Sequence, residues 1–214
     1  MEIINKQTNY WNEFAGKKEF TSNLDKEYFV KNIHLNSIIL DYGCGYGRTI
    51  KELIDCGYSN LIGVDIAEQM LELSKSKFPQ LQFEKLINQA TTLANDSCDT
   101  ILLLNTLTAI TEDLGQKNTI NEISRLLKQG GILYLTDFLL NSDERNLNRY
   151  AKYQDKYKTY GIFETEDGAI LRHQDKQNLI GLLSDFEIKS IQEMIVQTMN
   201  GNKSNAVAII AKKK

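Results

Sequence analysis

The sequence predicts an α/β fold with a mostly parallel sheet, helices on both faces and an antiparallel C-terminal hairpin. The first observation is an apolar run at residues 38–41 that leads through three glycines into a helical pattern, as in a strand, tight turn and helix. Strand-like and helix-like segments then alternate to about residue 140. Finally, two strand-like segments near the C-terminus are joined by an Asn200-Gly201 turn signal and by no helix.

Apolar periodicity predicts the elements in chain order. The helix after the glycines places Ile50, Leu53 and Ile54 on one face and ends at Gly57. The fourth strand is apolar almost throughout, as expected of a strand covered on both faces. The expected strands are 38–41, 61–65, 83–86, 98–105, 132–138, 186–191 and 206–211, and the expected helices after the glycines are 48–56, 68–78, 115–128 and 175–183.

Composition limits the class of protein. The 214 residues suit one domain, and the net charge of −3 offers no general attraction for nucleic acid. The apolar runs are too short to cross a bilayer. The three cysteines form no C-x-x-C pair, which favours reduced thiols in a cytoplasm and gives no sign of a metal site.

The glycine-rich stretch at residues 40–48 (LDYGCGYGR) resembles the first motif of class I S-adenosylmethionine-dependent methyltransferases. A nicotinamide dehydrogenase is the competing interpretation, but its fingerprint is G-x-G-x-x-G. Here the spacing is G-x-G-x-G, with Asp41 two residues ahead, which favours the methyltransferase. The resemblance implies a Rossmann-like sheet and S-adenosyl-L-methionine as cofactor, held by Asp41, Gly43, Cys44 and Gly45.

Further cofactor contacts follow from position and from this resemblance. Asp65 ends the second strand about 20 residues past the glycines, where a carboxylate can accept two hydrogen bonds from a ribose; capping the next helix is its alternative role. Ile66 and Met70 would lie against the adenine. Gln89 replaces the usual Asp that receives the adenine amino group, with the Ala90 N–H beside it. Asn105, at the end of the fourth strand, faces the transfer site or simply caps that strand.

Two segments are expected to cover the site within a single methyltransferase domain of residues 1–214. An aromatic N-terminal cover spans about residues 1–36, and its Tyr10 and Trp11 would touch cofactor or substrate, or only pack on the sheet. A lid insertion spans about residues 141–173, rich in tyrosines and charges. Within it we expect Arg172 and Tyr160 to contact substrate and His173 to act as a general base; a structural flap or dimer contact is the alternative.

The resemblance implies methyl transfer to a small-molecule acceptor with an N, O or S nucleophile, by in-line displacement. Residues 105–108 (NTLT) are not the N-P-P-[FYW] or D-P-P-[FYW] motif of amino-group methylases, so we expect no nucleic-acid partner. We also expect no membrane partner, and a monomer or homodimer. An NAD-dependent oxidoreductase and a non-catalytic S-adenosylmethionine-binding accessory protein remain the alternatives.

Overall fold

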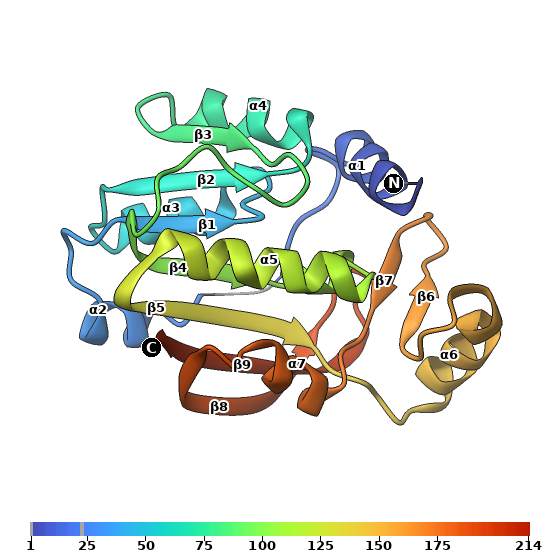
Figure 1. The fold of residues 1–214 in the computed structure, drawn as a ribbon. Coiled ribbons are helices and arrows are strands. Elements are labelled where there is room, and N and C mark those ends of the chain that lie inside the picture. The colour runs from blue at the N-terminus through green and yellow to red at the C-terminus, as the bar shows by residue number, and fades with distance from the viewer. Residues whose placement is uncertain (1, 22–23) are drawn as a thin grey trace.

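A seven-stranded sheet forms the centre of the molecule (Figure 1). The computed structural model describes residues 2–21 and 24–214, without the side chains of residues 2–5, so residues 1, 22 and 23 of the expected cover lie outside the described residues. Along the sheet the strands are β3 (Gln82–Lys85), β2 (Leu61–Asp65), β1 (Ile39–Tyr42), β4 (Cys98–Leu104), β5 (Leu127–Phe138), β9 (Lys203–Lys213) and β8 (Phe186–Gln197). β3, β2, β1, β4 and β5 pair in parallel, whereas β9 pairs antiparallel with both of its neighbours, β5 and β8. The predicted fold class is therefore confirmed.

Helices cover both faces of the sheet, which explains the continuous apolar runs of its central strands. On one face, α5 (Asp113–Leu126) and α7 (Lys176–Leu182) pack against alternate residues of β4 and β5 such as Ile101 and Leu133. On the other face, α2 (Lys26–Asn32) and α3 (Arg48–Asp55) pack against Leu102 and Tyr134. α4 (Glu68–Lys77) lies along β2 and β3.

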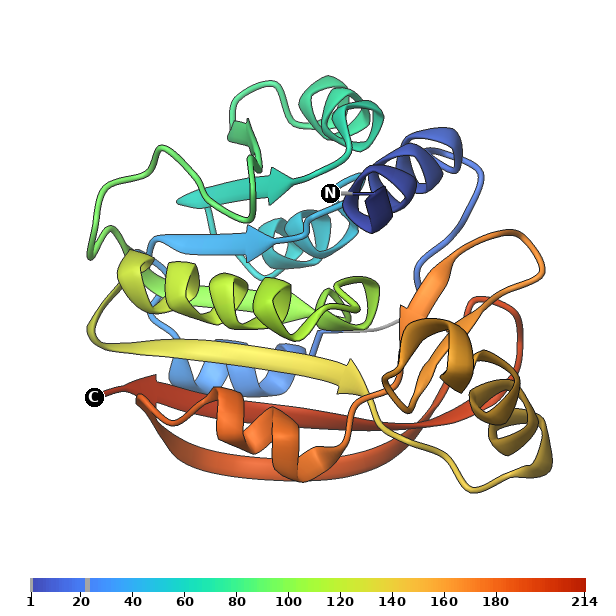
Figure 2. The ribbon, with the colours of Figure 1, turned by 45° about the vertical axis from the view of Figure 1, so that its right-hand side comes forward.

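Three further segments meet beyond the carboxyl ends of the parallel strands (Figure 2). They are α1 (Glu2–Glu13), the lid, which consists of α6 (Glu144–Tyr157) and the hairpin β6 (Ile162–Glu164) with β7 (Ile170–Arg172), and the turn between β8 and β9. Gln7 of α1 donates hydrogen bonds to the backbone oxygens of Ile170 and Ala109, the second at 2.8 Å. The chain's two covering segments are therefore joined above the strand ends.

Some boundaries differ from the sequence-based expectation. β5 begins at Leu127, ahead of the glycine pair expected to precede it, and β8 and β9 are each longer than the predicted strands. α6 was not predicted at all. Asp143 caps it by accepting a hydrogen bond from the Asn146 N–H at 3.2 Å, but its buried residues are only Asn146 and Tyr150, so no apolar period announces it.

No helix among the described residues is long and apolar enough to cross a membrane.

Candidate cofactor and acceptor site

The loop between β1 and α3 requires glycine for two reasons. Gly43 and Gly45 have φ values of +84° and +54°, in the left-handed region that side chains disfavour. A Cβ at Gly43 would lie 2.5 Å from Thr106 Oγ1, and one at Gly45 would lie 2.6 Å from the Phe20 ring. The loop is thus a cradle of bare backbone enclosed by two neighbouring side chains, and no larger residue fits there.

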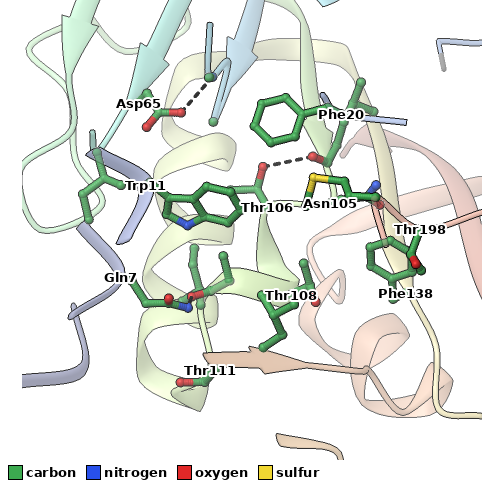
Figure 3. A pocket seen from close by; sticks show the side chains of 18 of the residues that line it. Gln7, Trp11, Phe20, Asp65, Asn105, Thr106, Thr108, Thr111, Phe138 and Thr198 are labelled. Atoms are coloured by element: carbon green, nitrogen blue, oxygen red, sulfur yellow. Dashed lines mark hydrogen bonds between the residues drawn. The ribbon is translucent and has the colours of Figure 1, made fainter. Parts of the chain in front are cut away.

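Asp65 joins the end of β2 to this loop (Figure 3). Its Oδ2 accepts a hydrogen bond from the Gly45 N–H and its Oδ1 one from the Ala67 N–H, both at 2.8 Å. Burial raises the pKa of Asp65, and these backbone donors oppose that rise. Asp65 therefore holds the loop and caps α4, and its carboxylate keeps lone pairs for further donors.

Asp41 is buried at the end of β1 and has an oxygen without a partner. Its side chain lines the cavity, and its Oδ2 makes no hydrogen bond. Burial raises the pKa of Asp41 to about 7, although the positive charge of Arg48 opposes that rise. An unpaired buried carboxylate oxygen is costly, so a ligand that brought a cation or an N–H donor to this point would be stabilised.

One cavity unites most of the predicted site residues. Its volume is about 240 Å³, and it opens beside the glycine loop, between the strand ends and the covering segments. Trp11 and Phe20 border it opposite Phe138 (Figure 3). The predicted residues that line it are Trp11, Asp41, Gly43, Cys44, Gly45, Asp65, Ile66, Met70, Gln89, Asn105 and His173.

Asn105 and Gln89 enter the cavity through strained backbone positions. Asn105 has a φ of +51°, and its N–H donates to the Thr136 oxygen at 2.7 Å, so the chain turns sharply where β4 ends. Gln89 has a φ of +63°, and its backbone oxygen accepts a hydrogen bond from the Tyr42 hydroxyl at 2.6 Å. Such positions persist only where the surroundings hold them, and they concentrate at functional sites.

Two predicted cofactor residues lie elsewhere. Tyr10 is buried outside the cavity lining, where its hydroxyl accepts a hydrogen bond from Lys18 at 2.6 Å and donates to Asp167 at 3.2 Å. This contact connects α1 to the β6–β7 turn. Tyr10 therefore links the N-terminal cover to the lid and does not face the cavity. Ala90 is bridged to Ile87 and is also absent from the lining. Its N–H donates to the Ile87 oxygen at 3.0 Å, and its place beside the adenine stays a prediction.

The predicted substrate contacts Arg172 and Tyr160 also fall outside the cavity lining. Arg172 points toward the start of α5, where it donates to the Thr111 oxygen at 3.1 Å and pairs with Asp113 at 2.5 Å. Tyr160 is about half exposed and packs edge-on against Tyr150. Arg172 therefore fastens the lid to α5, because alternate residues of a strand face opposite sides and Arg172 faces away from the cavity. Tyr160 packs within the lid.

His173 lines the cavity but is almost fully buried within the lid. Its Nδ1 lies 2.6 Å from the Tyr150 hydroxyl, and its Nε2 lies 3.3 Å from an Arg149 nitrogen. Arginine can only donate, so Nε2 accepts from Arg149, and the Asn141 amide nitrogen also lies 3.2 Å from Nδ1. Burial and the charge of Arg149 lower the pKa of His173 to about 3, which makes it a weak base. The geometry favours a positioning role over general-base catalysis.

Several residues that line the cavity were not predicted from the sequence. Most of them come from three covers, which are the N-terminal segment, the lid and the β8–β9 turn, and the others lie just after β4 or at the end of β5. Phe20 and the lid arginines belonged to segments that the sequence marked as covers, but nothing in the pattern showed which side chains face inward. The β8–β9 turn was visible only as a hairpin. The missed residues include Gln7, Phe20, Thr21, Thr106, Thr108, Phe138, Arg145, Arg149, Phe163, Thr198 and Met199.

Asp137, fully buried near the end of β5, gives a testable pH dependence. It accepts hydrogen bonds from the N–H groups of Thr108 and Phe138, and burial raises its pKa to about 7. The folded chain therefore keeps a proton that the unfolded chain loses near pH 4. This group's contribution to stability is complete below pH 4 and declines by roughly 1.4 kcal/mol per pH unit up to about pH 7.

Asp137→Asn cannot titrate, so its free energy of unfolding should fall less steeply between pH 4.5 and pH 7 than that of the parent protein. Urea unfolding at several pH values measures both slopes. The absolute stability of the variant is not the readout, because the new amide group faces backbone donors. Equal slopes in the two proteins would mean that Asp137 is ionised throughout the range.

Comparisons with known proteins agree on one chemistry. Residues 39–131 match the family described as a methyltransferase domain. The eEF1A lysine and N-terminal methyltransferase homolog of Drosophila melanogaster is 28% identical over 158 residues, which are 63% of this chain and 23% of that protein. The tRNA N(3)-cytidine methyltransferase of Bos taurus is 23% identical over 187 residues, 80% of this chain and 47% of that protein. The chain thus spans less than half the length of either relative.

A solved structure extends the likeness across the fold. A SAM-dependent methyltransferase from Methanosarcina mazei superposes with a TM-score of 0.80 at 26% identity, covering 86% of this chain and 95% of that one. The curated relatives correct one sequence-based expectation. The small-molecule acceptor without a nucleic-acid partner is contradicted, since these relatives are named for methylating a protein and a tRNA.

Proposed function

Since the chain belongs to the class I S-adenosylmethionine-dependent methyltransferases, we propose that it transfers the cofactor's methyl group to a ring nitrogen of an RNA base. The observation that carries the choice of acceptor is the positive charge on the lid side of the cavity. Arg145 and Arg149 line it there, and a relative that matches 80% of this chain is named as a tRNA N(3)-cytidine methyltransferase. Two cations repel a protonated amine and attract a nucleotide phosphate.

The residues present fit the cofactor. We propose that Asp65 receives the ribose hydroxyls, that Gly43 and Gly45 accept its methionine portion against bare backbone, and that the unpartnered Asp41 oxygen faces its amino group. Ile66 and Met70 offer apolar surface for the adenine, with Gln89 beside it. When bound, S-adenosylmethionine supplies a methyl group already activated by a sulfonium.

The weak basicity of His173 also supports a nucleobase as the methyl acceptor. N3 of neutral cytidine carries a lone pair and no proton, so it can attack a methyl group without a general base. A lysine or N-terminal amine must first lose a proton, and the histidine of this cavity, with a pKa of about 3, does not accept one near neutral pH. The chain's part is then to align the base and keep water out with Trp11, Phe20 and Phe138.

The arrangement of the domain follows. We propose that residues 1–36 and 141–173 are the cover and lid of a single methyltransferase domain, because both line the cavity and α1 bonds to β7. We also propose a cytoplasmic location, on the ground that Cys44, Cys56 and Cys98 are all unpaired.

The test is transfer of label from methyl-labelled S-adenosylmethionine to total tRNA and, in parallel, to total cell protein. We expect nuclease-sensitive label in the tRNA and, after digestion to nucleosides, a ring-methylated pyrimidine. Label confined to protease-sensitive material would overturn the RNA acceptor while keeping the methyltransferase. Cofactor binding without label in either fraction would favour the non-catalytic accessory protein. Binding of NAD in place of S-adenosylmethionine would restore the oxidoreductase alternative.

A further inference from the structure

Arg149 of α6 occupies an unusual position in the cavity wall. Its guanidinium carbon lies 3.5 Å from the centroid of the Phe163 ring, and one terminal nitrogen lies 3.3 Å from His173 Nε2. His173 is fixed in turn by Tyr150. Stacking and hydrogen bonding thus hold the planar guanidinium in one orientation at the edge of the cavity.

This arginine lacks the acid partner that other arginines have. Arg48, Arg125 and Arg172 pair with Glu52, Glu122 and Asp113 respectively. Among the described side chains, no carboxylate lies within ion-pair distance of Arg149, and its buried Nε has no hydrogen-bond partner. Asp143 acts on it electrostatically, but that acid already pairs with Arg145 at 3.8 Å.

The charge of Arg149 therefore remains uncompensated at the cavity. Burial lowers its pKa to about 10, which still leaves it charged at neutral pH. The groups that face it are Arg145 and Asp143 on its own helix, Tyr150, neutral His173 and the Phe163 ring. Helix α6 adds to the positive potential, because it carries four basic and two acidic residues. A partly buried cation without a counter-ion is stabilised by a ligand that brings one.

We propose that Arg149, with Arg145 beside it, binds a phosphate of the acceptor nucleotide and so fixes the base against the transfer site. The proposal rests on the proposed function, since it requires the acceptor to be a nucleotide. An arginine fork matches phosphate oxygens with two parallel hydrogen bonds, and its free Nε is a donor suited to that pairing. His173 then acts as a positioning residue, because its Nε2 orients the guanidinium.

The test compares probes that differ only in phosphate. Cytidine, cytidine 5′-monophosphate and cytidine 3′-monophosphate are titrated by calorimetry into protein saturated with S-adenosylhomocysteine. We expect at least one monophosphate to bind about tenfold or more tightly than cytidine. The advantage is the ratio of the monophosphate's affinity to that of cytidine. This ratio should fall to near one in Arg149→Ala and be partly retained in Arg149→Lys, which keeps the charge but not the guanidinium fork.

A matched control comes from the same helix. Lys152 is exposed and does not line the cavity, so Lys152→Ala removes one positive charge from α6 and should keep the advantage. All three variants should bind S-adenosylhomocysteine within about twofold of the parent, which shows that they are folded.

The proposed phosphate site and the proposed RNA acceptor are overturned by different results. An unchanged advantage in Arg149→Ala, or none in the parent, overturns the phosphate site even if tRNA is methylated. Loss of the advantage in Arg149→Ala supports the site even if no RNA is labelled, which would instead count against the proposed function. A carboxylate-bearing peptide that binds better than the nucleotides, and that depends on Arg149, overturns the phosphate assignment in favour of a protein acceptor.

Discussion

Replacing Asp65 by alanine should weaken the binding of S-adenosylhomocysteine by about 10²- to 10⁴-fold. In the proposed complex its carboxylate accepts two charge-assisted hydrogen bonds from the ribose, each worth roughly 1.5–3 kcal/mol. The structure adds a second cost, since the N–H groups of Gly45 and Ala67 both lose their acceptor at 2.8 Å. Titration calorimetry on the folded variant measures the loss.

Two further variants separate these contributions. Asp65→Asn keeps one carbonyl oxygen as an acceptor but removes the negative charge, so its affinity should fall between those of the parent and the alanine variant. Asp55→Ala removes an exposed acid from the end of α3, outside the cavity lining, and should leave affinity unchanged. An affinity of Asp65→Ala within twofold of the parent would remove Asp65 from the proposed site.

Much of the fold was predictable because local patterns and the sheet agree. β4 is apolar on both faces, and α5 and α2 cover those faces, so the run of Ile101, Leu102 and Leu103 has one sensible interpretation. The lid was also expected as an insertion at about residues 141–173, where the alternation of strands and helices stops. Helix α6 was not, because it packs through Tyr150 and carries polar residues around the rest of its surface.

The cavity lining was predictable where the backbone itself forms it. Strand ends and glycine positions follow from sequence spacing, so Asp41, Gly45 and Asp65 fall together. The covers are different, because the direction of a side chain depends on how the lid docks. Arg172 of β7 was expected in the cavity but faces away from it, whereas Arg149 of α6 lines the cavity.

The acceptor class shows where composition misleads. A net charge of −3 describes the whole chain, but a ligand meets only the local field. Asp41 and Asp65 line the cavity at the strand ends, in the proposed cofactor region, whereas Arg145 and Arg149 line it on the lid. Arg48 and Glu112 also line it, and Arg48 is paired with Glu52. This separation of charge exists only after folding, so the sequence could not exclude a nucleotide acceptor.

Replacing Gly45 by valine should reduce S-adenosylhomocysteine binding at least about 100-fold. A β-branched residue is strongly disfavoured at a φ of +54°, and its Cβ alone would lie 2.6 Å from the Phe20 ring. That ring cannot simply move aside, because it stacks on Tyr46 with centroids 5.0 Å apart. The loop or the cover must therefore shift, and either change alters the cradle that we propose holds the cofactor.

Gly168→Val is the matched control for this variant. Gly168 has a φ of +92°, but a Cβ there meets nothing within 4 Å, and the residue does not line the cavity. Both variants then carry a valine in the left-handed region, which costs on the order of 1–2 kcal/mol of stability, and only Gly45→Val also meets a clash at the proposed site. Thermal unfolding should show both destabilised, while calorimetry should show lost binding for Gly45→Val alone. Normal binding by Gly45→Val would place the cofactor away from this loop, and lost binding in both would make backbone strain the sole cause.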